Sequence, residues 1–401
     1  MSVHPFDPDS STGGIGLPGE DEDDDPDRDE TGRDLPLAEA PMLEKVDFLP
    51  LRKDLRAVAD SLTVPQARFV VDNYYTWQGN RIAAHNQVVA LTKSGEPHLA
   101  LDYVEKAYQR FEDDTKAMLD QFTRTQHMGV WARSIMGVGP VLAAALIAHL
   151  DITKAETAGH FWRFAGLDPT IKWLGTKGAA ELVDKVLKQC DADTITAEVL
   201  ALLAQTTHRR HEVIERMVTD PTSGRYSVAT AKKALARRPW NASLKVVCWK
   251  LGESFVKVAN YERDYYGKKI VQRKLYETDK NLRGDYSEQA EQKLRDFNIG
   301  RDTDAYYYYA GRLTPDMART IAALPAAQRQ AKVRAIAGAV GSGLPMLPPG
   351  HIHARCKRWA VKLFLSHWHG EAYRKHHGKE PPAPYPIAFL GHAHYMPAPV
   401  V

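Results

Sequence analysis

Two long stretches near the start of the chain place apolar side chains at helical spacing. Residues 65–91 and 98–126 return an apolar residue every three or four positions, and residues 94–97, with one glycine and one proline, separate them. Two long helices with a short break between them pack most simply as an antiparallel hairpin. We therefore predict a helical arm, of the hairpin or coiled-coil kind, over residues 42–127. We expect this arm to serve packing or the pairing of two copies of the chain.

A glycine turn between two apolar helices follows the arm. Residues 128–136 read as a short helix, Gly137-Val138-Gly139 as a tight turn, and Pro140 begins an alanine-rich second helix. This order is typical of a helix-hairpin-helix element, whose turn amides and positive helix end face one phosphate of a nucleic acid. Because a phosphate carries no base identity, we expect sequence-independent DNA binding through Gly137, Val138 and Gly139. The alternative is a packing turn between two core helices.

Basic residues cluster in two later segments. Four bases and no acid fall within seven residues just before a helix predicted over 242–258, whose apolar stripe is core. In the C-terminal helix, His351 and three bases recur on one face beside an apolar stripe. Both clusters suit contact with phosphates, and solvated helix faces are the alternative. The residues expected to extend the DNA contact are Lys232, Lys233, Arg237, Arg238, Arg355, Arg358 and Lys362.

The other segments follow from changes in composition. Residues 128–258 form the predicted helix-hairpin-helix domain, interrupted by a helical insertion over about 176–221. Residues 259–336 read as polar helices, and residues 337–350 as a linker rich in glycine and proline. Residues 351–401 read as the basic helix and a proline-rich tail. The predicted fold is mostly α, with a helical arm, a helix-hairpin-helix DNA-binding core and a basic C-terminal helix.

The small net charge of +3 conceals two oppositely charged parts. Residues 1–34 hold twelve acidic and two basic residues, so they carry −10 and the other 367 residues carry +13. Residues 1–41 are rich in Asp, Pro, Gly and Ser and are expected to form a disordered acidic head. A basic body with an acidic head suits a nucleic-acid binder whose head competes with phosphate. A purely solubilising head is the alternative.

The overall composition excludes several classes of protein. With 44% hydrophobic and 26% charged residues, the chain is neither wholly disordered nor fibrous. No apolar run approaches the roughly 20 residues of a membrane span, and no secretory signal is visible. The three cysteines, Cys190, Cys248 and Cys356, are far apart and fit neither a disulfide framework nor a paired metal site. We therefore expect a cytoplasmic protein with reduced thiols and no membrane contact.

The hairpin motif is similar to one found in a family of insertion-sequence transposases. That family joins a RuvC-like DEDD catalytic domain to a small C-terminal helix-hairpin-helix transposase domain, and the present chain resembles the latter alone. The resemblance implies DNA binding and a role in the transposition of a mobile element. Transposase-annotated chains that lack the DEDD half are similar over further segments. The resembling residues are 134–140, 143–145, Phe161, 164–167 and Pro169, more weakly 232–255, and also 238–245, 248–258 and 391–395.

The catalytic features of that family are incomplete in this sequence. No strand-like segment with a metal-binding Asp lies upstream of Gly129, and a two-metal nuclease needs converging carboxylates. The family's serine motif aligns with Trp173, Leu174 and Gly175, so its serine is absent. Ser223, in a Thr-Ser-Gly-Arg segment after the insertion, is a candidate for the displaced nucleophile, and an ordinary loop is the alternative. Whether the chain is an active transposase or recombinase therefore stays open.

Eight of the sixteen histidines lie beyond residue 350. Three His-x-His pairs occur there, but residues i and i+2 of a helix point in roughly opposite directions and cannot hold one ion. Only His392 and His394, in the proline-rich tail, have the extended context that such a Mg²⁺ or Zn²⁺ site would need. Polar or phosphate-contacting histidines are the alternative. The leading prediction is a DNA-binding, transposase-related protein, and the second is a recombinase or nuclease that uses Ser223 or these histidines.

Overall fold

The computed structural model describes residues 53–337, 343–383 and 396–399, and within these ranges the chain is all α. These described residues form seventeen α-helices and two short 3-10 helices, with no strand among them and one isolated bridge between Thr219 and Tyr226. The predicted mostly α class is therefore confirmed. The acidic head and the candidate metal ligands His392 and His394 lie outside the described residues. None of the described helices is long and apolar enough to cross a membrane.

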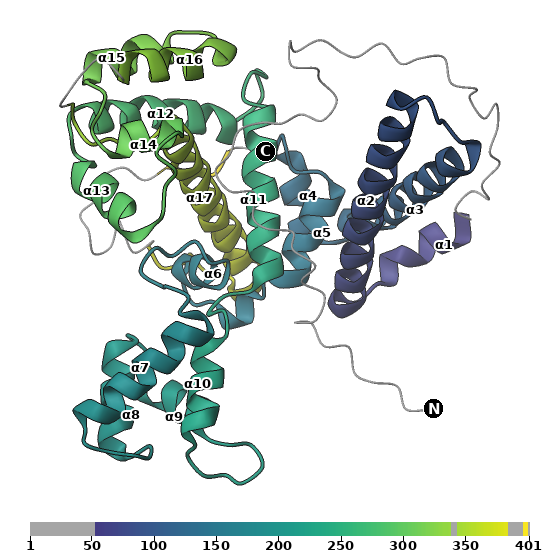
Figure 1. Ribbon diagram of the computed structural model, residues 1–401. Helices are drawn as coiled ribbons and strands as arrows, with labels where there is room; N and C mark the ends of the chain where they lie inside the picture. The colour runs from purple at the N-terminus through teal and green to yellow at the C-terminus, as the bar shows by residue number, and fades with distance from the viewer. Residues whose placement is uncertain (1–52, 338–342, 384–395, 400–401) are drawn as a thin grey trace.

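The predicted arm is an antiparallel pair of long helices (Figure 1). Thr63 and Gln66 form a capping box at its start, in which each side chain accepts a hydrogen bond from the other residue's amide. Between the two helices, Arg81 bonds to Glu112 at 2.7 Å. The arm consists of α1 (Lys53–Val58), η1 (Ala59–Ser61), α2 (Val64–Lys93) and α3 (Leu99–Thr125).

The alanine-rich helix of the hairpin is buried at the centre of the molecule. Helices α2, α3, α4 and α11 all contact α5, and the side chains from Ala143 to Leu146 have no exposed surface. Small alanine side chains let these backbones approach closely, which is why so many helices can share one partner. The helices of this region are α4 (His127–Ser134), α5 (Pro140–His149), η2 (Ile152–Lys154), α6 (Ala158–Phe164) and α11 (Ala242–Lys257).

The insertion is a small lobe with a hydrophobic core of its own (Figure 1). That core runs from Ala179 to Leu235, so the lobe extends beyond the predicted 176–221 and includes the helix that carries Lys232 and Lys233. The reason is that this helix packs against the first helix of the lobe. The two helices are far apart in the sequence, since Ala231 follows Val183 by some fifty residues. The lobe consists of α7 (Gly175–Gln189), α8 (Ala197–Thr206), α9 (His211–Val218) and α10 (Val228–Ala236).

The C-terminal helix is a core element, which differs from the amphipathic surface helix that the sequence predicted. Helix α17 (Pro349–His377) packs against α12, α11 and α6, and buried residues occur on all of its sides. His351, predicted to belong to a basic face, is 4% exposed and bonds through Nδ1 to the Tyr309 hydroxyl at 2.9 Å. His369 bonds through Nε2 to the Ala155 carbonyl oxygen, so it also serves the fold.

The helices between the hairpin domain and α17 form the remaining part of the structure. Part of the expected linker is packed: Met346 and Leu347 have no exposed surface, and the Leu347 amide donates to Asn281 at 2.9 Å. Five helices lie between Val258 and the described end of this part of the chain at Ala337. They are α12 (Tyr266–Leu282), α13 (Ser287–Asp296), α14 (Asp304–Tyr309), α15 (Pro315–Ala322) and α16 (Ala326–Ala337).

Candidate nucleic-acid interface

The hairpin turn between α4 and α5 has the shape that its glycines predicted. Gly137 has a φ of +90°, a conformation that side chains other than glycine rarely adopt. Its carbonyl oxygen accepts a hydrogen bond from the Ser254 hydroxyl of α11 at 2.5 Å. Gly139 is exposed, and a Cβ atom there would meet nothing within 4 Å. Gly137 therefore faces the core, and Gly139 faces solvent.

Val138 does not fit its predicted contact with phosphate. Its side chain is 5% exposed within the core, and its amide donates to the Ile135 carbonyl oxygen at 3.0 Å. An amide that is already bonded in this way has no second hydrogen for a ligand. Within the part of the chain that the structure describes, the Gly139 amide has no bonded partner, so it is the turn amide that could meet a phosphate.

Two sequence segments of the hairpin domain, separated by the lobe, close against one another. The Asn241 amide donates to the Phe164 carbonyl oxygen at 2.9 Å, and the Asn241 side chain caps α11 through the Leu244 amide. The Trp240 ring rests on Gly166, where a Cβ would lie 2.8 Å from Trp240 Cγ. The lobe is thus inserted into a loop whose two ends meet at this point.

Cations and tryptophan rings alternate on the surface around this closure. The Arg238 guanidinium lies 4.9 Å from the centre of the Trp173 ring, and Lys245 Nζ lies 4.2 Å from that of Trp240. Lys362 Nζ lies 5.6 Å from the Trp162 ring, whose Nε1 donates to the Lys362 carbonyl oxygen. Together with Arg358, we name these residues the cation–tryptophan surface. It comprises Trp162, Trp173, Arg238, Trp240, Lys245, Arg358 and Lys362.

The cations of this surface lie close enough to repel one another. Burial, followed by the charges of Arg358 and Arg238, lowers the pKa of Lys245. Burial also lowers the pKa of Lys362; nearby Asp168 opposes this effect, and Arg355, Arg358 and Arg273 add to it. An anion placed between these side chains would relieve the repulsion, which is the electrostatic condition for a phosphate-binding surface.

The structure separates the other predicted contacts from this surface. Arg355 Nε bonds to the buried Glu277 carboxylate at 2.8 Å, so its charge already has a partner. Lys232 bonds to Asp184 of the lobe at 2.6 Å. Arg237 and Lys233 are exposed, with Arg237 directly beside Arg238. Lys245 and the tryptophans were not among the predicted contacts, although Trp240 and Lys245 both lie in the family-like segment 238–245.

The hairpin turn and the cation–tryptophan surface lie at different levels of α11. Gly137 contacts Ser254, whereas Lys245 lies nine residues earlier on the same helix. At 1.5 Å per residue this separation is about 14 Å along the axis. The residues predicted to bind DNA therefore lie in two places rather than one.

Ser223 lies at the tip of an exposed loop in the lobe. Asp220 Oδ1 accepts hydrogen bonds from the amides of Thr222 and Ser223 and from the Ser223 hydroxyl at 3.2 Å. These amide bonds lower the pKa of Asp220, which makes it a poor general base. No group of three or more His, Cys, Asp or Glu side chains among the described residues could hold a metal ion.

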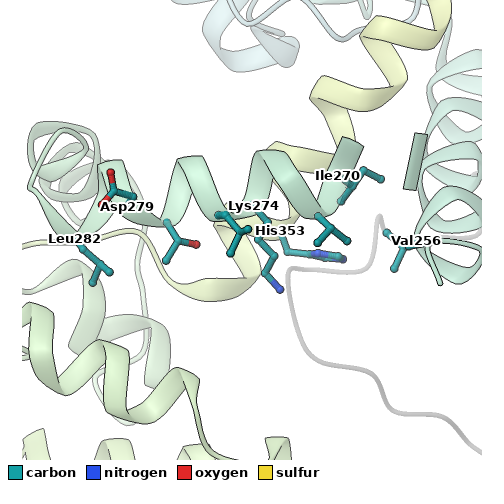
Figure 2. Close-up of a pocket in the computed structure, with 10 residues that line it drawn as sticks. Val256, Ile270, Lys274, Asp279, Leu282 and His353 are labelled. Atoms are coloured by element: carbon teal, nitrogen blue, oxygen red, sulfur yellow. The ribbon is translucent and has the colours of Figure 1, made fainter. Parts of the chain in front are cut away.

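One further hollow of the surface has a different character. A groove of about 580 Å³ lies along α12, where Ile270 and Leu282 line it and Val256 of α11 lies at one end (Figure 2). His353 reaches it from α17 beside Lys274. The lining is mainly apolar, so this groove does not have the chemistry of a phosphate site.

The stretch from the end of α4 to the first half of α7 contains the hairpin turn, α5, α6 and Trp173. Residues 131–182 match one family model, that of the Transposase IS116/IS110/IS902 family. These residues form a transposase domain of the IS110 family. The resemblance noted in the hairpin motif is thereby confirmed. No curated protein and no solved structure matches the chain.

The IS110-family transposase domain contains only part of the candidate interface. The matched residues supply Gly139, Trp162 and Trp173, whereas Arg238, Lys245, Arg358 and Lys362 lie beyond residue 182. The lobe begins within the match and interrupts the fold immediately after Trp173. The cation–tryptophan surface is therefore completed by later parts of the chain, which fold back onto the transposase domain.

Proposed function

We propose that this protein binds DNA through its phosphate backbone, as a transposase-related protein without a complete catalytic apparatus of its own. The cation–tryptophan surface is the main contact, and the Gly139 amide is a second one. The observation that carries the proposal is the convergence of Arg238, Lys245, Arg358 and Lys362 beside the IS110-family transposase domain. Such a surface reads charge and spacing rather than base edges, so the binding is sequence-independent.

The arm offers a route to the pairing of two copies of the chain. Apolar side chains stay exposed on both of its long helices, among them Phe69 at 70%, Ile82 at 46% and Phe111 at 51%. Two copies that pair through these faces would double the number of phosphate contacts on one DNA. We therefore include a homo-oligomer formed through α2 and α3 in the proposal.

Removing charge from the cation–tryptophan surface is the direct test of DNA binding. Arg238→Gln and Arg358→Gln should each weaken binding to a duplex, because each removes a cation that displaces counterions from the DNA. In a plot of log affinity against log salt concentration, the slope should fall by about one unit for each lost phosphate contact. Fluorescence anisotropy with two duplexes of unrelated sequence, measured over a range of salt concentrations, gives both quantities.

Arg319→Gln is the matched control for that test. Arg319 is equally a surface arginine, 58% exposed, but it lies on α15 in another part of the structure. It should leave the affinity and the salt dependence unchanged. If the three variants lose affinity by the same amount, binding depends on overall charge alone and the proposed surface is wrong.

The hairpin turn is tested at Gly139 and not at Gly137. Gly139→Val places a side chain in open space at an ordinary φ of −81°, so the protein should fold normally while the valine shields the turn amide. We expect a loss of DNA affinity of a few-fold that is the same for all sequences. Gly137→Val would instead strain a residue with positive φ against Phe255 and Val258, so its effect would report on folding. Wild-type affinity in Gly139→Val would show that the turn only packs helices.

A further inference from the structure

Trp173 differs from the other tryptophans of the cation–tryptophan surface because its ring is both exposed and fixed. Trp173 is 48% exposed and lies in the irregular segment between α6 and α7. Its Nε1 donates to the Ala236 carbonyl oxygen at 2.7 Å, and the Arg238 guanidinium lies over the ring. A large apolar ring that is held in place and half in water is suited to a flat partner.

The neighbouring rings have structural partners on their faces. The Trp240 ring has Lys245 Nζ 4.2 Å from its centre and also lies against Gly166. Trp162 is partly buried, and its Nε1 bonds to the main chain of α17. For Trp173, Arg238 is the one cation or ring found against a face in the described part of the chain. About half of the Trp173 surface is therefore open to solvent beside a cation.

We propose that Trp173 is a stacking platform for an unpaired base of a nucleic-acid strand, whose phosphates lie on Arg238, Lys245 and Arg358. The inference rests on the proposed function and deepens it by naming the form of nucleic acid at this surface. A duplex keeps its base faces stacked inside and offers only phosphates, whereas a single strand also offers base faces. Stacking on an aromatic side chain tolerates any base, which agrees with sequence-independent contact.

The test compares single strands with duplexes in Trp173→Ala and Trp173→Phe. Trp173→Ala should weaken binding of a 20-nucleotide oligo(dT) about tenfold and binding of a 20-base-pair duplex less than twofold. Trp173→Phe keeps an aromatic face and should retain most of the single-strand affinity. Oligo(dT) should also quench tryptophan emission of the wild-type protein more than that of Trp173→Phe. A parallel series with oligo(U) shows whether the strand is DNA, RNA or either. Each of these results would support the stacking of an unpaired base on Trp173.

Phe297→Ala is the matched control. The Phe297 ring is 56% exposed and has Lys293 Nζ 4.2 Å from its centre, but it lies at the end of α13. Its removal should change neither affinity. If Trp173→Ala weakens duplex and single strand equally, or neither, the inference is wrong and the ring only joins the lobe to the domain. Failure of the proposed function would give a different result. The wild-type protein would then show no strongly salt-dependent binding to either the duplex or the single strand.

Discussion

Glu277→Ala should lower the free energy of unfolding by about 2–4 kcal/mol. The substitution removes a buried carboxylate and leaves two partly buried guanidinium groups without their partner. Glu277 is 1% exposed and bonds to Arg273 and to Arg355, and the Tyr286 hydroxyl donates to the same carboxylate. Burial raises the pKa of Glu277, but the bonds from Tyr286 and the two arginines outweigh it and leave the pKa below its usual value. The carboxylate is therefore charged at neutral pH. Urea denaturation at pH 7 measures the loss.

Glu291→Ala provides the control for this experiment. Glu291 also pairs with an arginine on a helix, Arg295, but its side chain is 52% exposed. Pairs in water contribute little, so its removal should cost less than about 1 kcal/mol. Equal losses in the two variants would show that water reaches the Glu277 network and screens it. Arg355, which the sequence placed among the DNA contacts, would then be available to a ligand after all.

Stability should fall between about pH 6.5 and pH 4 because of His149, the last residue of α5. This ring is 7% exposed, and neither of its nitrogens has a hydrogen-bond partner among the described residues. Burial, assisted by the charge of Arg68, lowers the pKa of His149 to about 4, against an ordinary value of 6.5. In this range His149 is therefore protonated in the unfolded chain and neutral in the folded chain. Above pH 6.5 the ring is neutral in both states and the free energy of unfolding does not depend on it. The full loss of about 3 kcal/mol in the free energy of unfolding is reached near pH 4.

His149→Met isolates that contribution. An apolar side chain of similar size should remove the part of the pH dependence due to residue 149, and it should also stabilise the protein at pH 7 by about 1 kcal/mol because no unbonded polar group is buried. Burial likewise lowers the pKa values of His367 and His369, so some pH dependence remains. His211→Met, at an exposed position of the lobe, is the control. Parallel stability curves for His149→Met and the wild type would contradict the prediction.

Local pattern was sufficient for the elements whose side chains alternate between core and solvent. The two arm helices follow from apolar residues at helical spacing and from the break at 94–97. The hairpin follows from Gly137, which needs a positive φ, and from Pro140, which begins the next helix. The motif was also enough to indicate a transposase-family domain, and residues 131–182 match that family.

Local pattern was misleading where a helix is surrounded by protein. The face of α17 with His351, Arg355, Arg358 and Lys362 reads as a solvated basic stripe, but the structure divides it. His351 is buried beside Tyr309, and Arg355 is bonded to Glu277, which lies 78 residues earlier in the chain. A cation and its distant partner leave no signature at short sequence spacing, so charge alone could not identify Arg355 as a structural arginine.

The sequence by itself determined the helical class, the hairpin turn and the transposase family, because each depends on residues within a few turns of one another. Only the tertiary structure decided which basic residues share a surface. Arg238 and Lys245 lie in one segment, Trp173 precedes the lobe, and Arg358 lies on α17. They meet because the lobe is inserted between Trp173 and Arg238, and because α17 returns through the core to lie against α6 and α11. Such convergence arises from the packing of apolar faces far apart in the chain, which periodicity along the sequence does not encode.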